Sequence, residues 1–473
     1  MKDYRQFYID GAWVEPVGRR CFELIDPATE QPYGTVSLGS AEDVDRAVQA
    51  ARQAFVSYSQ TSKAQRIALL QRIVEVFDAR QADVMQAISL EMGAPLSLTG
   101  QTGSALACFR QAIETLNSYE FEVALGDNLI RREAIGVCGL IAAWNWPIQL
   151  LSIKLASALA AGCTVVAKPS EYTPASARVL AEILHEAGVP KGVFNLVNGD
   201  GPEVGHAISA HPGIDLVSFT GSTRAGILVA EAAAASVKRV SQELGGKSAN
   251  IILPDADLAA AAKWNITRGF SNAGQSCHAP TRILVHHSQL EDLLTLLREE
   301  VERHVRVGDP RDPATTMGPV VNARQFASIQ RHIGIGLEEG GRLVCGGPGR
   351  PEGLEHGYYI RPTVFADVKP TDTLAQEEIF GPVLVVMTYA DIDEALAIAN
   401  GTDYGLGAYI FGRDQQQTLA VARRCQAGRV FLNGAPSNNV APMGGYKKSG
   451  NGREMGVFGL EEYLEVKSLI GFL

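Results

Sequence analysis

The stretch TVVAKPSEYTPASARVLAEILHEAGVPKGVFNLVNGDG, residues 164–201, contains two apolar runs with a helical pattern between them. The first run covers 164–167, residues 175–188 place apolar side chains at three- and four-residue spacing, and 192–199 form the second run. Strands that are apolar throughout and alternate with amphipathic helices are typical of a parallel sheet covered by helices on both faces. The stretch therefore predicts an α/β fold.

The same alternation continues along the chain. Helical patterns at 201–211 and 223–235 flank the strand IDLVSFTGS, residues 214–222. A second series of strands and helices follows Glu243. Its expected strands are 249–254, 281–286, 361–368, 407–412 and 428–434. We therefore predict two doubly wound α/β domains that join near residues 243–248.

One uncharged segment, IGVCGLIAAWNWPIQLLSI (135–153), is long enough to cross a membrane. Asn145, Pro147 and Gln149 lie in its centre, where a membrane helix would be apolar. We favour a buried strand, a turn at 144–147 and a helix that begins at Pro147, and keep the membrane span as the alternative.

Composition limits the compartment and the partners. The N-terminal residues MKDYRQFYIDG lack the apolar segment of a signal peptide. The seven cysteines are scattered, odd in number and never spaced as CxxC, which is typical of a reduced, cytoplasmic protein without disulfides or a zinc site. The net charge of −10 and the absence of a basic block argue against nucleic acid or an anionic membrane as partner.

Two segments fit neither domain. Residues 121–133 alternate like a β-hairpin, and LEVKSLIGFL at 464–473 has the pattern of a strand. A lone hairpin is only marginally stable. We therefore expect the two segments to pair with each other and with another subunit.

Several motifs could carry chemistry, and each also has a plain structural interpretation. Cys277 lies in the polar loop FSNAGQSCHAP, where it is either a nucleophile or part of a simple turn. The motif KPSE (168–171) follows a strand end, where ligands bind in such sheets or where a solvated turn would lie. Glycines at 199–205 and 221–226 could admit a phosphate to a helix N-terminus or only tighten a turn. Glu243 is either an active-site carboxylate or a surface charge.

Seven motifs that follow one another along the chain favour the functional interpretations over the structural ones. They are WNWP, KPSE, FTGS, ELGGKS, GQSC, EEIFGPV and PMGGYKKSG. With them the chain closely resembles the NAD(P)-dependent aldehyde dehydrogenase superfamily over essentially its full length. The resemblance implies a Rossmann-like NAD-binding domain at 1–118 and 135–245 and a catalytic domain at 246–446. It also implies a small β oligomerisation element at 119–134 and 447–473, and hence a homo-oligomer, either a dimer or a tetramer.

The resemblance also implies the catalytic roles. Cys277 would attack the aldehyde to form a thiohemiacetal, and Asn145 with the backbone N–H of Cys277 would bind the oxyanion. Hydride loss to the cofactor would leave a thioester, which water activated by Glu243 would hydrolyse. Lys154 and Glu454 match a relay behind that glutamate, although an interior ion pair explains them equally well.

For the cofactor, the resemblance implies NAD, with NADP as an alternative, because a carboxylate at Glu171 accepts from a ribose hydroxyl and repels a 2′-phosphate. It implies no metal. The matching cofactor residues are Lys168, Glu171, Gly201, Gly221, Ser222, Leu244, Glu378 and Phe380. The matching residues around the aldehyde are Trp146, Leu150, Ile153, Ser271, Ser276, His278 and Met443.

The substrate class follows less directly. Succinic-semialdehyde relatives carry an arginine six residues before the nucleophile, and betaine-aldehyde relatives carry an aromatic residue there, whereas this chain has Ser271. We therefore expect a medium aliphatic or aromatic aldehyde, with semialdehyde, betaine-type and CoA-acylating enzymes as alternatives. CoA-acylating relatives usually lack the base that Glu243 matches, and an inactive family member would be expected to lose Cys277, Glu243 or Asn145.

Overall fold

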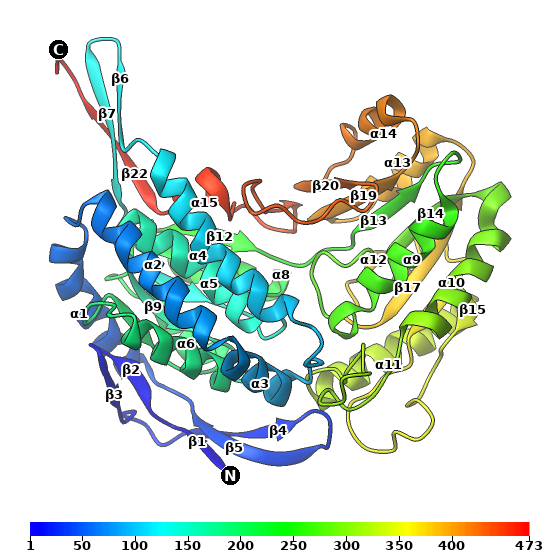
Figure 1. Cartoon of the computed structure of the whole chain (residues 1–473), viewed down its shortest axis with the longest axis horizontal. Helices are drawn as coiled ribbons and strands as arrows, with labels where there is room; N and C mark the ends of the chain where they lie inside the picture. Colours follow the sequence, from blue (N-terminus) through cyan, green and yellow to red (C-terminus); the bar gives the residue numbers. More distant parts are fainter. Residues whose placement is uncertain (473) are drawn as a thin grey trace.

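The predicted alternation of strands and helices forms two α/β lobes with a projecting arm, as the computed structural model of residues 1–472 shows (Figure 1). The first lobe is built on a seven-stranded sheet whose order is β12-β11-β8-β9-β10-β2-β3. The five strands from β12 to β10 are parallel, and β2 and β3 add an antiparallel edge. In sheet order the strands are Arg239–Glu243, Leu216–Thr220, Val137–Ile141, Thr164–Lys168, Phe194–Leu196, Phe7–Ile9 and Ala12–Val14.

Helices cover both faces of this sheet. They are α1 (Ala41–Tyr58), α2 (Lys63–Ala79), α3 (Gln81–Met92), α4 (Gly100–Ser118), α5 (Pro147–Ala161), α6 (Pro174–Glu186), α7 (His206–Ala210), α8 (Thr223–Ala234) and α15 (Gly456–Glu461). The helix predicted at 201–211 is instead a π-helical turn over Gly201–Gly205 followed by the short α7.

The uncharged segment 135–153 lies inside this lobe. Its first half is the fully buried β8, and its second half enters α5, which begins at Pro147 and ends where Gly162 adopts a left-handed φ of 91°. Because α5 lies between the sheet and the layer of α2 and α4, it is buried almost all round, so it lacks an amphipathic pattern. Among residues 1–472, no helix is long and apolar enough to cross a membrane.

The second lobe contains another seven-stranded sheet, ordered β15-β16-β17-β14-β13-β19-β20 and parallel except for β15. In sheet order the strands are Arg342–Cys345, Thr363–Ala366, Val383–Tyr389, Arg282–His286, Ala249–Ile252, Gly407–Phe411 and Arg429–Leu432. The helices of this lobe are α9 (Leu258–Gly269), α10 (Leu290–His304), α11 (Ala323–Glu338), α12 (Thr373–Gln376), α13 (Ile392–Asn400) and α14 (Gln415–Ala422).

Three small sheets complete the structure. One joins β1 (Lys2–Tyr4), β5 (Gln31–Ser37) and β4 (Cys21–Asp26), and a second joins β18 (Tyr404–Gly405) to β21 (Tyr446–Lys447). The third is the arm, in which β7 (Asn128–Ala134) lies between β6 (Glu122–Leu125) and the C-terminal strand β22 (Leu464–Leu469). The arm projects from the first lobe at the upper left of Figure 1.

The predicted pairing of the hairpin with the C-terminal strand is therefore observed. The boundary of the arm differs from the expected residue 447. Residues 449–452 form hydrogen bonds with β12, and α15 packs on α4 and α5, so this part of the chain lies against the first lobe. Only β22 joins the hairpin.

Candidate active site

The loop that carries Cys277 has an unusual backbone. It follows a turn of 3₁₀-helix at Ser271–Gly274, in which Asn272, Ala273 and Gly274 have φ values of 55°, 54° and 71°. A left-handed backbone costs free energy for residues other than glycine, so the surrounding structure must hold it in place. A Cβ on Gly274 would lie 2.2 Å from the carbonyl oxygen of Gly381, so only glycine fits there.

Buried amides hold this loop in place. Asn145, in the turn before α5, donates from Nδ2 to the Gln275 carbonyl over 3.1 Å, and its own carbonyl accepts from Asn272 over 2.9 Å. Gln275 in turn accepts from the backbone N–H of Val321. The amide nitrogen of Asn145 carries a second hydrogen, which makes it a candidate donor to a substrate oxygen beside the loop.

The thiol of Cys277 is neutral at rest. Burial, aided by the negative charges of Glu378 and Glu243, raises the pKa of Cys277 to about 12. The Sγ atom lies 3.9 Å from Nδ1 of His278, and burial together with Arg268 and Arg429 lowers the pKa of that imidazole to about 3. A thiol in this state needs a base to become a nucleophile.

Glu243 is a suitable base. It is the last residue of β12, it is only 3% exposed, and neither carboxylate oxygen has a hydrogen-bond partner within the described chain. Burial and the nearby Glu454 raise the pKa of Glu243 well above its usual value, although Lys154 opposes this shift. An unpaired buried carboxylate is costly for stability and is a feature of functional sites.

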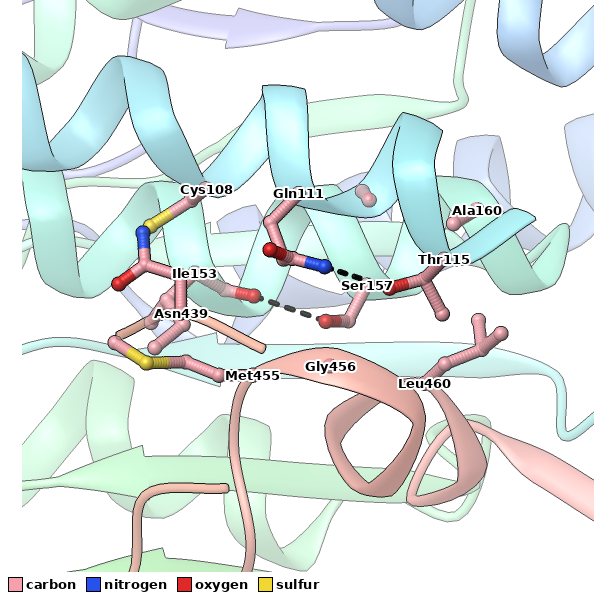
Figure 2. A pocket seen from close by; sticks show the side chains of 11 residues that line it. Cys108, Gln111, Thr115, Ile153, Ser157, Ala160, Asn439, Met455, Gly456 and Leu460 are labelled. Carbon is pink, nitrogen blue, oxygen red and sulfur yellow. Dashed lines mark hydrogen bonds between the residues drawn. The ribbon is translucent and has the colours of Figure 1, made fainter. Parts of the chain in front are cut away.

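Lys154 and Glu454 form a buried ion pair behind Glu243. A small cavity of about 20 Å³, with space for about one water molecule, lies where α4, α5 and α15 meet. Figure 2 shows the side chains that line it. Cys108, Ser157 and Met455 line it, and Ser157 donates to the carbonyl of Ile153. Ile153, which the resemblance implies near the aldehyde, lines this small cavity.

The candidate ribose site lies where β9 ends. Lys168 is buried, and its Nζ donates to the carbonyls of Pro169 and Gly199 and lies 4.0 Å from the carboxylate of Glu171. Burial lowers the pKa of Lys168, whereas Glu171 raises it. The Glu171 side chain is 25% exposed, so its oxygens remain available as hydrogen-bond acceptors at this strand end.

The candidate phosphate region adjoins this point. Gly201 opens the π-helical turn, and a Cβ built on it meets no atom within 4 Å. Gly221 lies between β11 and α8, and Ser222 caps α8 by accepting from the backbone N–H of Ala225. Leu244 packs against Gly226, where a Cβ would lie 2.7 Å from the leucine side chain. Small residues therefore surround the N-terminus of α8, where a phosphate would bind.

Glu378 and Phe380 approach from the second lobe. Glu378 accepts from the backbone N–H of Gly246 over 3.0 Å, and burial raises the pKa of Glu378 to about 7. Phe380 has a φ of 57° and packs edge-to-face on Trp144 with a ring separation of 5.4 Å. The predicted cofactor residues thus come from both lobes, and their binding of a dinucleotide remains a prediction.

A cavity of about 210 Å³ lies next to the nucleophile loop. Three of the predicted aldehyde-site residues, Trp146, His278 and Met443, line it. Ser276 supports the wall by accepting from the indole N–H of Trp146 over 2.8 Å. Leu150 and Ser271 line neither cavity described here, and their predicted contact with the aldehyde remains a prediction.

Sequence reasoning missed several residues of this cavity. They are Gly100, Ser104, Gln149, Arg268, Leu406, Gly407, Arg429, Phe431, Ser437, Asn439 and Met455. They come from segments far apart in the chain, so no local pattern indicates their proximity. No sequence signal would have identified Arg268, because only the fold shows whether a carboxylate lies near an arginine.

Comparisons with known proteins identify the family of the chain. The model of the aldehyde dehydrogenase family matches residues 13–469. The chain is 51% identical to a 3-succinoylsemialdehyde-pyridine dehydrogenase from a Pseudomonas species, over all of this chain and 99% of the relative.

Solved structures are similar as well. A mutant of aldehyde dehydrogenase C from Pseudomonas syringae, in complex with NAD⁺ and octanal, superposes with a TM-score of 0.98 at 52% identity, over 99% of this chain and 97% of that one. Betaine aldehyde dehydrogenase from Staphylococcus aureus in complex with NAD⁺ has a TM-score of 0.94 at 35% identity, over 98% and 94%.

Proposed function

This chain belongs to the aldehyde dehydrogenase family, and from that premise we propose that it oxidises an aldehyde to the carboxylic acid with NAD⁺ through a thioester on Cys277. The observation that carries the proposal is that three groups with complementary chemistry lie close together. A neutral thiol stands on a strained loop, an amide is bonded to that loop, and an unpaired buried carboxylate lies nearby.

The attack on the aldehyde uses all three groups. Glu243 accepts the thiol proton as Sγ bonds to the carbonyl carbon, because a thiol with a pKa of about 12 gives almost no thiolate by itself. The carbonyl π electrons move to oxygen, where the side-chain N–H of Asn145 and the backbone N–H of Cys277 stabilise the oxyanion. The product of this step is a thiohemiacetal.

NAD⁺, when bound, would supply the two-electron acceptor for the hydride of the former aldehyde carbon. Lys168, Glu171 and Gly201 would hold its adenosine half, and Glu378 and Phe380 its nicotinamide half. Once the hydride is lost, a thioester remains on Cys277, and Glu243 releases the thiol proton to solvent. Glu243 then takes a proton from water as the water attacks the thioester, the C–S bond breaks, the leaving thiolate regains a proton from Glu243, and the acid leaves.

The relatives support the choice of cofactor and the size of the substrate. Several are bound to NAD⁺, one of them with octanal, and another is described as acting on a pyridine semialdehyde. We therefore propose NAD over NADP and a medium aliphatic or aromatic aldehyde. The presence of Glu243 favours water over CoA as the acyl acceptor.

One assay tests the proposal. Purified protein is mixed with a panel of aldehydes and either NAD⁺ or NADP⁺, with and without CoA, while reduced cofactor is followed by absorbance. We expect acid and NADH without CoA. The absence of a signal with every aldehyde would overturn the proposal, and strict dependence on CoA would redirect it to an acylating enzyme.

A further inference from the structure

The cavity beside the nucleophile carries two positive charges on its wall. Of the residues that line it, Arg268 is the exposed penultimate residue of α9 and the half-buried Arg429 begins β20, and no aspartate or glutamate is among those residues. His278 stands between this wall and the thiol, 3.9 Å from Cys277 Sγ on one side of its ring and 3.4 Å from an Arg268 nitrogen on the other. The cationic wall is thus one imidazole ring away from the reacting atom.

Neither guanidinium is neutralised by the chain. Within residues 1–472, no carboxylate lies within 4.0 Å of Arg268 or Arg429. Glu243 does exert a weaker electrostatic effect on Arg429. Because arginine stays charged in proteins, the wall keeps its positive potential, which accords with the lowered pKa of the neighbouring imidazole.

The position of Arg429 is fixed by the backbone. Its guanidinium donates to the carbonyl of Asn438 over 2.6 Å and lies over the ring of Phe431 at 5.5 Å from the ring centre. A guanidinium has five N–H donors, so most of them remain for a ligand. The planar arrangement of these donors matches a carboxylate.

We propose that this wall binds a carboxylate at the far end of the aldehyde, so that among medium aliphatic aldehydes the enzyme prefers those that end in a carboxylate, the semialdehydes of dicarboxylic acids. This inference rests on the proposed function. Ser271 stands where succinic-semialdehyde relatives carry an arginine, so the sequence alone disfavours a semialdehyde. In this chain Arg268 and Arg429, from α9 and β20, would supply the positive charge instead. The apolar part of the cavity, with Trp146, Phe431 and Met443, would accommodate the chain between the two ends.

The experiment compares matched pairs of aldehydes that differ only in the terminal carboxylate: hexanal with adipic semialdehyde, and octanal with suberic semialdehyde. The ratio of kcat/KM within each pair is measured for the wild type, Arg429→Gln, Arg268→Gln and Arg429→Lys. Arg423→Gln, at an exposed position at the end of α14, is the control for net charge.

We expect the wild type to favour the carboxylate by about tenfold or more, and each Gln variant to lose about tenfold of that preference, as loss of a hydrogen bond to a charged group does. Arg429→Lys should keep part of the preference, and Arg423→Gln all of it. A wild-type enzyme with equal kcat/KM for octanal and suberic semialdehyde overturns the inference, whether or not the variants fold.

A binding measurement separates this inference from the proposed function. Calorimetry with Cys277→Ala, which cannot turn over, compares suberic semialdehyde with octanal. Tighter binding of suberic semialdehyde that is lost in Cys277→Ala/Arg429→Gln supports the carboxylate site even if the wild type oxidises no aldehyde. Equal binding of the two aldehydes, together with oxidation of hexanal by the wild type, rejects the site and leaves the proposed function intact.

Discussion

Lys154 and Glu454, which lie 300 positions apart in the chain, form an ion pair whose side chains are 0% and 5% exposed. One oxygen of Glu454 accepts from Lys154, and the other has no hydrogen-bond partner within the described residues. The negative charge of Glu454 raises the pKa of Glu243, and the positive charge of Lys154 lowers it. Burial is the main reason that the pKa of Glu243 is raised, and the pair adjusts that pKa in opposite directions.

This relationship predicts opposite pH shifts from two variants. Glu243 works as a carboxylate, so activity falls as pH drops through its raised pKa. Glu454→Gln removes a negative neighbour and should move the acid limb of the kcat profile down by about one pH unit, whereas Lys154→Met should move it up. Melting temperatures identify variants that lose activity by unfolding. Shifts in the same direction would contradict this electrostatic account.

Glu243→Gln should separate the two halves of the reaction. If the carboxylate mainly activates water, the variant gives a burst of NADH of at most one per site, followed by turnover reduced by about 100- to 10,000-fold. Mass spectrometry should then find an acyl group on Cys277. A slow burst would place the main role of Glu243 in deprotonating the thiol, and wild-type turnover would exclude both roles. Cys277→Ala should give no acid while still binding NAD⁺.

Glu171 predicts the preference between cofactors. Its carboxylate would repel the 2′-phosphate of NADP, so Glu171→Gln should raise the NADP/NAD ratio of kcat/KM by about tenfold or more. Glu186→Gln, on the same lobe at the last residue of α6, controls for net charge. An unchanged ratio in Glu171→Gln would show that this side chain does not face the ribose.

Gly274→Ala tests the strained nucleophile loop. The new Cβ would lie 2.2 Å from the Gly381 carbonyl at a φ of 71°, so the loop must move and activity should fall sharply. Gly188→Ala is the matched control, since Gly188 has a φ of 78° and no atom within 4 Å of the added Cβ. That control should cost only about 1–2 kcal/mol of stability and keep the activity. Equal loss of activity in both variants would refute the steric argument.

The arm predicts assembly into a dimer or tetramer. β22 leaves Val466 64% exposed, and Ile470 and Phe472 beyond it are 86% and 58% exposed. β22 is an edge strand, and an edge strand with exposed apolar side chains on and beside it is a site for pairing with another chain. Light scattering at micromolar concentration should give a dimer or tetramer mass, and Val466→Pro should reduce it. A monomeric wild type would reject this prediction.

The sequence determined what depends on neighbouring residues. Apolar runs between amphipathic helices indicated both parallel sheets, and the polarity and glycine content of 270–280 indicated that Cys277 stands in a loop. The order of the seven motifs indicated the family, which the comparisons confirm.

The tertiary structure decided what depends on sheet order and on packing between lobes. It brought Lys154 to Glu454, left Glu243 buried without a partner, and placed Arg268 and Arg429 on one cavity wall. Lys154 and Glu454, like Arg268 and Arg429, are separated by more than a hundred positions, so no local propensity or spacing records that they lie close together. The charges of Lys154, Glu243 and Glu454 also interact strongly only because the fold removes them from water, and that desolvation is a property of the assembled structure.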